Sequence, residues 1–174
     1  AKTTYQHEKP ALGKVVLVTD LEDAEANLFL QSVRDFFGKV LPEGDCEWEV
    51  LGSGSFGSVK ELLGKVEELR PDLLVTYRNL GSESWRWPYS LGEHLDVLTQ
   101  VTTTPVLVLP HPDREDCAER LSRELLNIMA VSGHLCGEGT LIQYASTFTP
   151  ERGRLILSQV EDKATLDRYL DALD

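Results

Sequence analysis

The chain of 174 residues has only three cysteines, Cys46, Cys117 and Cys136, and no CxxC spacing. Three thiols cannot pair completely, so the sequence predicts a reducing, cytoplasmic setting rather than a disulfide scaffold. Long apolar runs are also absent. The stretches 15–18 and 105–110 have the length of a strand and fall far short of the ~20 residues that cross a bilayer. We therefore expect no membrane-spanning segment.

Basic side chains are scarce. Lys and Arg number 17 against 29 Asp and Glu, so the formal net charge is 17 − 29 = −12. Binding to a phosphate backbone needs clustered cations, and this excess of acids argues against nucleic acid as a partner. The acids are scattered among apolar residues, which is typical of a globular surface. With 41% apolar residues, a chain of this length is expected to bury an ordinary core.

Signatures of catalysis are missing too. The sequence contains neither a GxSxG nucleophile elbow nor the HRD and DFG triplets of protein kinases. His134 and Cys136 are close in sequence, but no second close pair completes a four-ligand zinc site. A response-regulator receiver needs a phosphoacceptor aspartate where residues 76–78 read Thr-Tyr-Arg. The sequence therefore predicts no catalytic mechanism.

What is present is a regular alternation of strand and helix signals. The strand signals are continuous apolar runs rather than alternating ones, which indicates a parallel sheet covered on both faces. The sequence thus predicts an α/β three-layer sandwich with a mostly parallel open sheet. We expect Asp23 to cap the first helix and Gly38 to end it. The expected strands are 14–20, 47–51, 73–77 and 106–109, and the expected helices are 24–37, 58–69 and 91–101.

The remainder of the chain repeats the start weakly. A shift of 131 − 18 = 113 positions lays Asn127 over Lys14 and gives three identities in sixteen residues. We interpret residues 14–110 as one domain, and 111–174 as a linker helix plus the first half of a second. A half unit cannot cover its own sheet, so it packs on the first unit, is completed by another chain, or belongs to a longer protein. Its expected elements are helices 114–125, 140–148 and 164–173 and strands 128–131 and 155–160.

A GxGxxG motif is formed by Gly52, Gly54 and Gly57, directly after an expected strand and before a helix. That context matches a dinucleotide-binding turn, in which free N–H groups face a pyrophosphate. Arg78, at the end of the next strand, would favour a 2′-phosphate, so an NADP-binding oxidoreductase fragment is one hypothesis. The alternative is a flexible turn that is rich in glycine and serine.

A second candidate is the long connection 78–92, which follows an apolar strand. It contains two tryptophans, a tyrosine and two arginines. In open α/β sheets this edge is where ligands bind, so the segment is expected to line a pocket or to contact a protein partner through residues 85–89. The tryptophans can equally cover a sheet edge or pack on a partner subunit.

Residues 70–110 resemble the C-terminal half of a universal stress protein (UspA-type) domain. Asp72-Leu73-Leu74-Val75 corresponds to that family's Asp-Leu-Ile-Val, Gly92 to its second-motif glycine, and the run after Pro105 to its last strand. The similarity extends over 14–110, with one strand–helix pair absent between residues 38 and 46.

The resemblance implies the adenine nucleotide alpha hydrolase-like fold, a regulatory homodimer, and a possible ATP or AMP site. That site would use Asp20, Arg78, Gly81, Ser90 and Gly92. Asp20 matches the acid that ends the family's first strand, Gly92 matches its second-motif glycine, and Gly81 is adjacent to a loop-glycine position. Tyr77 and Leu80 stand where the family has its first loop glycines, and Glu93 stands where it has a hydroxyl. A carboxylate there repels phosphate from a helix N-terminus, so we expect a degenerate site that binds no triphosphate.

Overall fold

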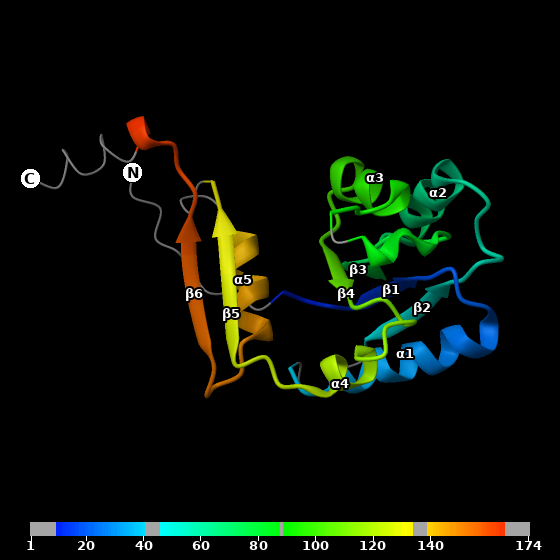
Figure 1. Ribbon diagram of the computed structural model, residues 1–174, viewed down its shortest axis with the longest axis horizontal. Helices are drawn as coiled ribbons and strands as arrows, with labels where there is room; N and C mark the ends of the chain where they lie inside the picture. Colours follow the sequence, from blue (N-terminus) through cyan, green and yellow to red (C-terminus); the bar gives the residue numbers. More distant parts are fainter. Residues whose placement is uncertain (1–9, 41–45, 88, 134–138, 166–174) are drawn as a thin grey trace, which may run out of the picture. The chain divides into compact units, whose positions relative to one another are not determined.

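The computed structural model describes residues 10–40, 46–87, 89–133 and 139–165. The chain forms two compact units: Ala11–Arg123, and Glu124–Asp174 together with Ala1–Pro10. Each unit is built from strands joined by helices, as Figure 1 shows.

The first unit contains a four-stranded sheet in the order β2-β1-β3-β4, and every neighbouring pair is parallel. The two central strands, β1 and β3, consist almost wholly of buried residues, because helices cover both faces of the sheet. The strands are β1 (Lys14–Val18), β2 (Glu47–Leu51), β3 (Leu73–Tyr77) and β4 (Val106–Leu109).

Helices flank this sheet on both sides. In Figure 1, α1 (Asp23–Phe37) and α4 (Cys117–Ser122) lie on one face, while α2 (Val59–Leu69) and α3 (Glu93–Val101) lie on the other. The expected α/β three-layer sandwich with a parallel open sheet is therefore confirmed. The largest fully buried side chains include Tyr77 and Leu17 from the sheet and Leu62, Leu95 and Leu98 from the helices.

The helix ends follow local chemistry. The hydroxyl of Ser58 accepts a hydrogen bond from the Glu61 N–H at 3.3 Å and so caps α2. Gly38 ends α1, as expected. The prediction that Asp23 caps α1 is wrong. Because the Ala26 N–H donates to the Glu22 carbonyl at 2.8 Å, Glu22 is the N-cap residue and Asp23 already lies in the first turn.

Helix α4 is shorter than the expected 114–125. A turn precedes it, in which the Arg114 N–H donates to the His111 carbonyl at 3.1 Å, and Arg123 after it is extended. α4 contacts α1 and buries Cys117 and Leu121. The ammonium of Lys39 donates to the Ser122 carbonyl at 2.8 Å, so a cation compensates the C-terminal end of the helix.

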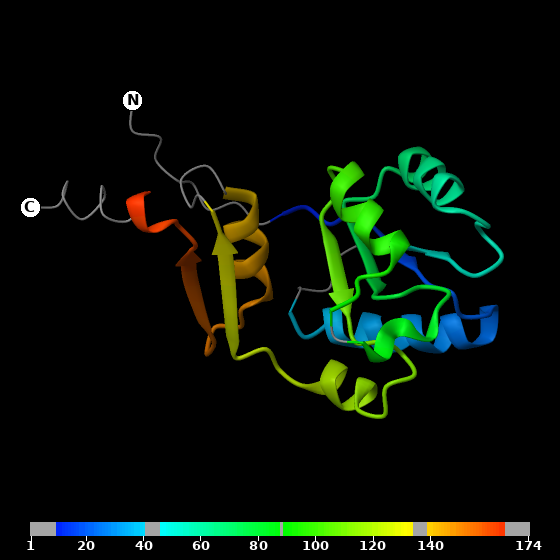
Figure 2. The ribbon, with the colours of Figure 1, turned by 45° about the horizontal axis from the view of Figure 1, so that its top comes forward.

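The second unit contains β5 (Asn127–Ser132), α5 (Gly139–Phe148) and β6 (Arg154–Gln159). The two strands pair in parallel, and α5 lies against one face of the pair (Figure 2). On the opposite face Met129, Val131 and Ile156 are exposed. Strand β5 begins at the position that the internal repeat aligns with the start of β1. Most of the helix expected at 164–173 lies outside the described residues.

Candidate functional site

The strongest candidate site lies at the carboxyl ends of β1 and β3, where Asp20 follows one strand and the segment 78–92 follows the other. One carboxylate oxygen of Asp20 accepts a hydrogen bond from the Tyr77 hydroxyl. The other accepts from the Gly81 N–H at 2.5 Å. The chain's own donors therefore occupy both oxygens of the acid that the sequence predicts as a nucleotide ligand.

Tyr77 is the centre of this arrangement, and its side chain is completely buried. Its hydroxyl lies 2.6 Å from the Thr19 hydroxyl and also accepts from the Asp20 N–H at 3.2 Å. Burial, together with the hydrogen bond to Asp20, raises the pKa of Tyr77 well above its ordinary value. The phenol therefore stays protonated and remains a hydrogen-bond donor to the carboxylate.

His111, which follows β4, packs edge-on against the Tyr77 ring with the ring centroids 4.7 Å apart. Burial lowers the pKa of His111, and the nearby Asp113 and Asp20 only partly oppose this effect. Its Nδ1 accepts a hydrogen bond from the Asp113 N–H at 3.2 Å. The imidazole is therefore neutral near pH 7 and packs against the Tyr77 ring as part of its buried surroundings.

Asn79 holds the two ends of the segment 78–92 together. Its N–H donates to the Leu91 carbonyl at 2.9 Å, and its side-chain oxygen accepts from the Ser90 hydroxyl at 2.8 Å. Asn79 adopts a φ of 61° and Gly92 a φ of 82°, both in the left-handed region. A Cβ on Gly92 would lie 2.6 Å from the Asn79 Cα, so only glycine permits this approach.

Four of the five predicted site residues thus fall into two local groups. Asp20 accepts from Gly81, while Ser90 bonds to Asn79 and Gly92 packs against the Asn79 backbone. The fifth, Arg78, is half-buried at the same end of β3. Sequence reasoning missed Tyr77, which bonds to Asp20, and Asn79, which bonds to Ser90. Acids also mark the start of α3, since Glu93 and Asp96 both lie in its first turn. Negative charge there opposes an anionic ligand.

The GxGxxG segment has a different geometry. None of its three glycines has a positive φ, since among the described glycines only Gly81 and Gly92 do. The Gly57 N–H donates to the Glu61 carboxylate at 2.7 Å, which places a negative side chain where a phosphate would bind. The Phe56 ring contacts the ring of His94 in α3. This is the geometry of a capped turn.

Arg78 is also badly placed to complete a dinucleotide site with that turn. It follows β3, whereas the glycine motif follows β2, and β1 lies between the two strands in the sheet. In a dinucleotide fold the ribose contact comes from the strand next to the one that carries the glycines. The proposed pairing of the motif with Arg78 therefore has no support in the strand order.

Two aromatic residues of the segment 78–92 are exposed. The segment contains a short 3₁₀ helix, η1 (Glu83–Arg86), whose first turn is fixed by the Ser82 hydroxyl accepting from the Ser84 N–H at 3.1 Å. Beyond it, Trp87 and Tyr89 are 71% and 98% exposed. Two large aromatic residues of this segment are thus presented to solvent.

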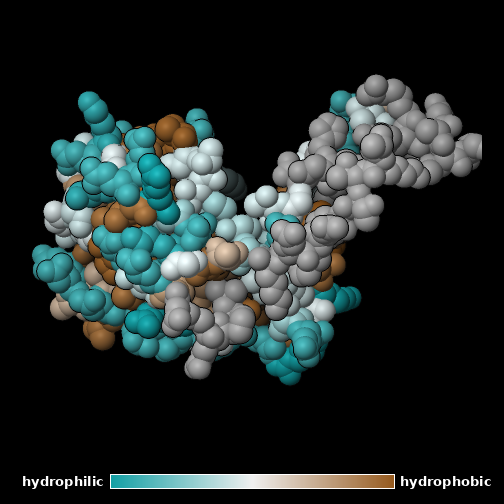
Figure 3. All heavy atoms as spheres, turned by 180° about the vertical axis from the view of Figure 1, so that it is seen from behind, coloured by the Kyte–Doolittle hydropathy of each residue, from teal (hydrophilic) through white to brown (hydrophobic). Residues whose placement is uncertain are grey.

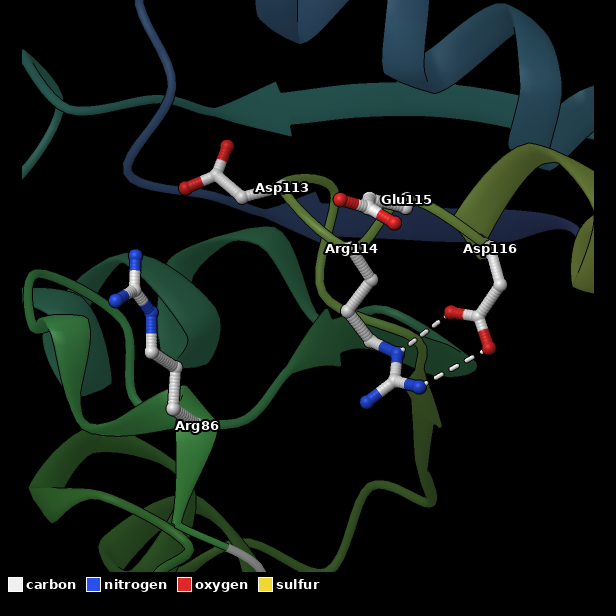
Figure 4. A pocket seen from close by; sticks show the side chains of 5 residues that line it. All are labelled: Arg86, Asp113, Arg114, Glu115 and Asp116. Carbon is white, nitrogen blue, oxygen red and sulfur yellow. Dashed lines mark hydrogen bonds and ion pairs between the residues drawn. The ribbon is translucent and has the colours of Figure 1, made fainter.

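Arg86 also borders an open hollow that is lined on its other side by the segment after β4. Figure 4 shows Arg114 directed at Asp116, with Asp113 and Glu115 pointing elsewhere. The Arg114 guanidinium holds the Asp116 carboxylate through two hydrogen bonds, of 2.8 and 3.0 Å. That contact and a further one from Arg120 keep the pKa of Asp116 far below its ordinary value.

Within the described part of the chain, no group of three or more His, Cys, Asp or Glu side chains is placed to hold a metal ion. Burial raises the pKa of both Cys46 and Cys117, so neither thiol is activated. His134 and Cys136 lie outside the described residues.

Comparison with known proteins adds no assignment. No family model matches the chain, and neither the curated proteins nor the solved structures yield a significant match. No helix among the described residues combines the length and apolarity needed to cross a membrane.

Proposed function

We propose that this chain is a universal stress protein-like regulatory module, acting in the cytoplasm as a homodimer, and that it binds no ATP in the manner of that family. The observation that carries the proposal is the occupied carboxylate of Asp20, which accepts from the Tyr77 hydroxyl and the Gly81 N–H. The resemblance of residues 70–110 to the family supplies the regulatory assignment.

A nucleotide at this edge would have to displace those two donors. Leaving a partly buried donor or acceptor without a partner costs about 1–3 kcal/mol, so the entry of a ribose hydroxyl exchanges bonds without gain. The triphosphate would also meet Glu93 and Asp96 at the start of α3. The second effect opposes ATP more strongly than it opposes an uncharged ligand.

Isothermal titration calorimetry with ATP, AMP and NADPH tests the proposal. We expect no binding heat for the intact chain with any of the three. Gly92→Ser would add a hydroxyl at the start of α3 but would strain the backbone. The informative variant is therefore Glu93→Ser, which replaces the carboxylate by a hydroxyl. Glu67→Ser on α2 is its matched control. Tight ATP binding by the unchanged chain, abolished by Asp20→Ala, would overturn the proposal.

A second function is supported by the exposed aromatic residues of the same segment. Trp87 and Tyr89 are of the residue types that dominate protein interfaces, and they are 71% and 98% exposed. We propose that residues 85–89 contact a protein partner, the second subunit of the dimer included. Sedimentation of Trp87→Ala with Tyr89→Ala is expected to show loss of a dimer. An unchanged mass would count against this role.

A further inference from the structure

A groove beside α1 combines apolar walls with an acidic rim. It runs between α1 and the segment after β4 and encloses about 300 Å³. Its apolar lining consists of Leu21, Leu28, Phe29 and Pro112, and its acidic lining of Glu25 and Asp113. We call these six residues the acidic groove.

Leu28 is the most unusual member. It lies in the middle of α1, where its side chain is 72% exposed, while Phe29 beside it is buried in the core. On the face seen in Figure 3, apolar atoms likewise reach the surface in separate patches among hydrophilic ones. A single exposed leucine is ordinary, but one that borders a concave apolar surface supplies an anchor for another side chain.

The charged residues that line the groove itself have one sign. None of the described residues that line the acidic groove is basic. Glu22 and Asp23, both exposed, precede Glu25 at the start of α1. Asp113 also lines the neighbouring hollow, where Arg86 lies on the other side and Arg114 is engaged by Asp116. His111 adds no charge near pH 7, because burial lowers its pKa.

From these observations we infer that the acidic groove is a docking site for a segment of a partner protein in which a lysine or arginine adjoins a leucine or phenylalanine. The aliphatic or aromatic side chain would pack on Leu28 and Pro112, and the cation would lie between Glu25 and Asp113. Acids at a rim mainly raise the association rate and make it depend on salt, while the apolar contact limits dissociation.

The test uses the full chain and short fluorescein-labelled peptides, with binding measured by fluorescence anisotropy at low and high salt. The probe alternates lysine with leucine. There are two control peptides. One alternates lysine with serine, and the other alternates glutamate with leucine. We expect that only the lysine–leucine peptide binds and that its affinity falls as the salt concentration rises.

Variants separate this groove from the general acidity of the chain. Leu28→Ala is expected to weaken the lysine–leucine peptide about tenfold, as truncation of an interface anchor does. Glu25→Lys with Asp113→Lys should abolish its salt dependence. The matched controls are Val101→Ala and Glu67→Lys, because these residues line a hollow between α2 and α3 that also contains Arg70.

Three results would overturn the inference. One is absence of binding by the lysine–leucine peptide. Another is equal binding of the lysine–serine peptide, which would mean attraction by net charge only. The third is equal weakening by the groove and control variants. Leu28 and Glu25 are exposed, so folding of their variants is expected to survive and is checked by thermal unfolding.

Discussion

Two glycine-containing loops follow the carboxyl ends of β2 and β3 in the first unit, and their glycines have different roles. In the β3 loop (residues 78–92), Gly81 and Gly92 take positive φ angles, and Gly92 lies against the backbone of Asn79. In the β2 loop (residues 52–58), no glycine has a positive φ and Gly54 has open space around it. The β2 loop contains the GxGxxG spacing, yet its backbone conformation does not require glycine. The backbone conformation of the β3 loop does require it.

The contrast teaches that a glycine motif in sequence does not reveal what the glycines are for. The β2 loop is ordered by side chains, since Ser58 and Glu61 satisfy the N–H groups at the start of α2. The β3 loop is ordered by backbone geometry and by Asp20, Tyr77 and Asn79. Substitutions in each loop test these two sources of order separately.

The largest effect is expected from Gly92→Ala. The new Cβ would lie 2.6 Å from the Asn79 Cα, at a φ of 82°. A left-handed backbone costs a non-glycine residue roughly 1–2 kcal/mol, and overpacking adds about 1–3 kcal/mol, so the free energy of unfolding should fall by about 2–5 kcal/mol. Gly54→Ala is the matched control and should change it by less than about 0.5 kcal/mol. Equal effects in urea unfolding would erase the distinction between the loops.

Tyr77→Phe should have the next largest effect. It removes the hydroxyl that serves Asp20 and Thr19, and it leaves their oxygens in a buried site. We expect a loss of about 1–3 kcal/mol in the free energy of unfolding. Tyr89→Phe, at a position 98% exposed, is the control and should be neutral. A neutral Tyr77→Phe would show that the β3 loop does not depend on these hydrogen bonds.

Ser58→Ala tests the source of order in the β2 loop. Loss of the cap on α2 should lower the free energy of unfolding by about 1 kcal/mol. The exposed Ser53, in the same loop, provides the control Ser53→Ala, which should change little. Equal effects of the two variants would mean that the cap is not what orders this loop.

The smallest effect is confined to acid pH. Because the pKa of His111 is lowered in the folded protein, the unfolded chain binds more protons at acidic pH. The free energy of unfolding should therefore fall as pH drops below about 6.5, with the stabilisation fully present above that value. In His111→Gln this part of the pH dependence should disappear. Its persistence in the variant would assign it to another group.

Much of the fold is readable from the sequence, because local signals and the final environment agree. The bounds of β2, β3 and β4 match the expected strands residue for residue. β3 and β4 are apolar runs, while β2 combines two glutamates with three apolar residues. Helix α4 fell short of its expected length because Arg114 bonds to Asp116 in a turn that precedes the helix. Propensity alone does not register that contact.

The candidate site is only partly readable. Asp20 and Gly92 follow from the resemblance to a family, but Tyr77 is part of an apolar strand and is easily taken for core alone. Its hydroxyl partners become visible only when β1 and β3 pair in register. Asn79 carried a weak signal, because asparagine is enriched at left-handed positions near glycine.

Hydrogen exchange of the Gly81 amide tests the central claim most directly, namely that the chain's own donors fill the site at Asp20. We expect slow exchange in the unchanged protein, fast exchange in Asp20→Ala, and no change when ATP is added. Fast exchange in the unchanged protein, or protection that arises only with ATP, would contradict it.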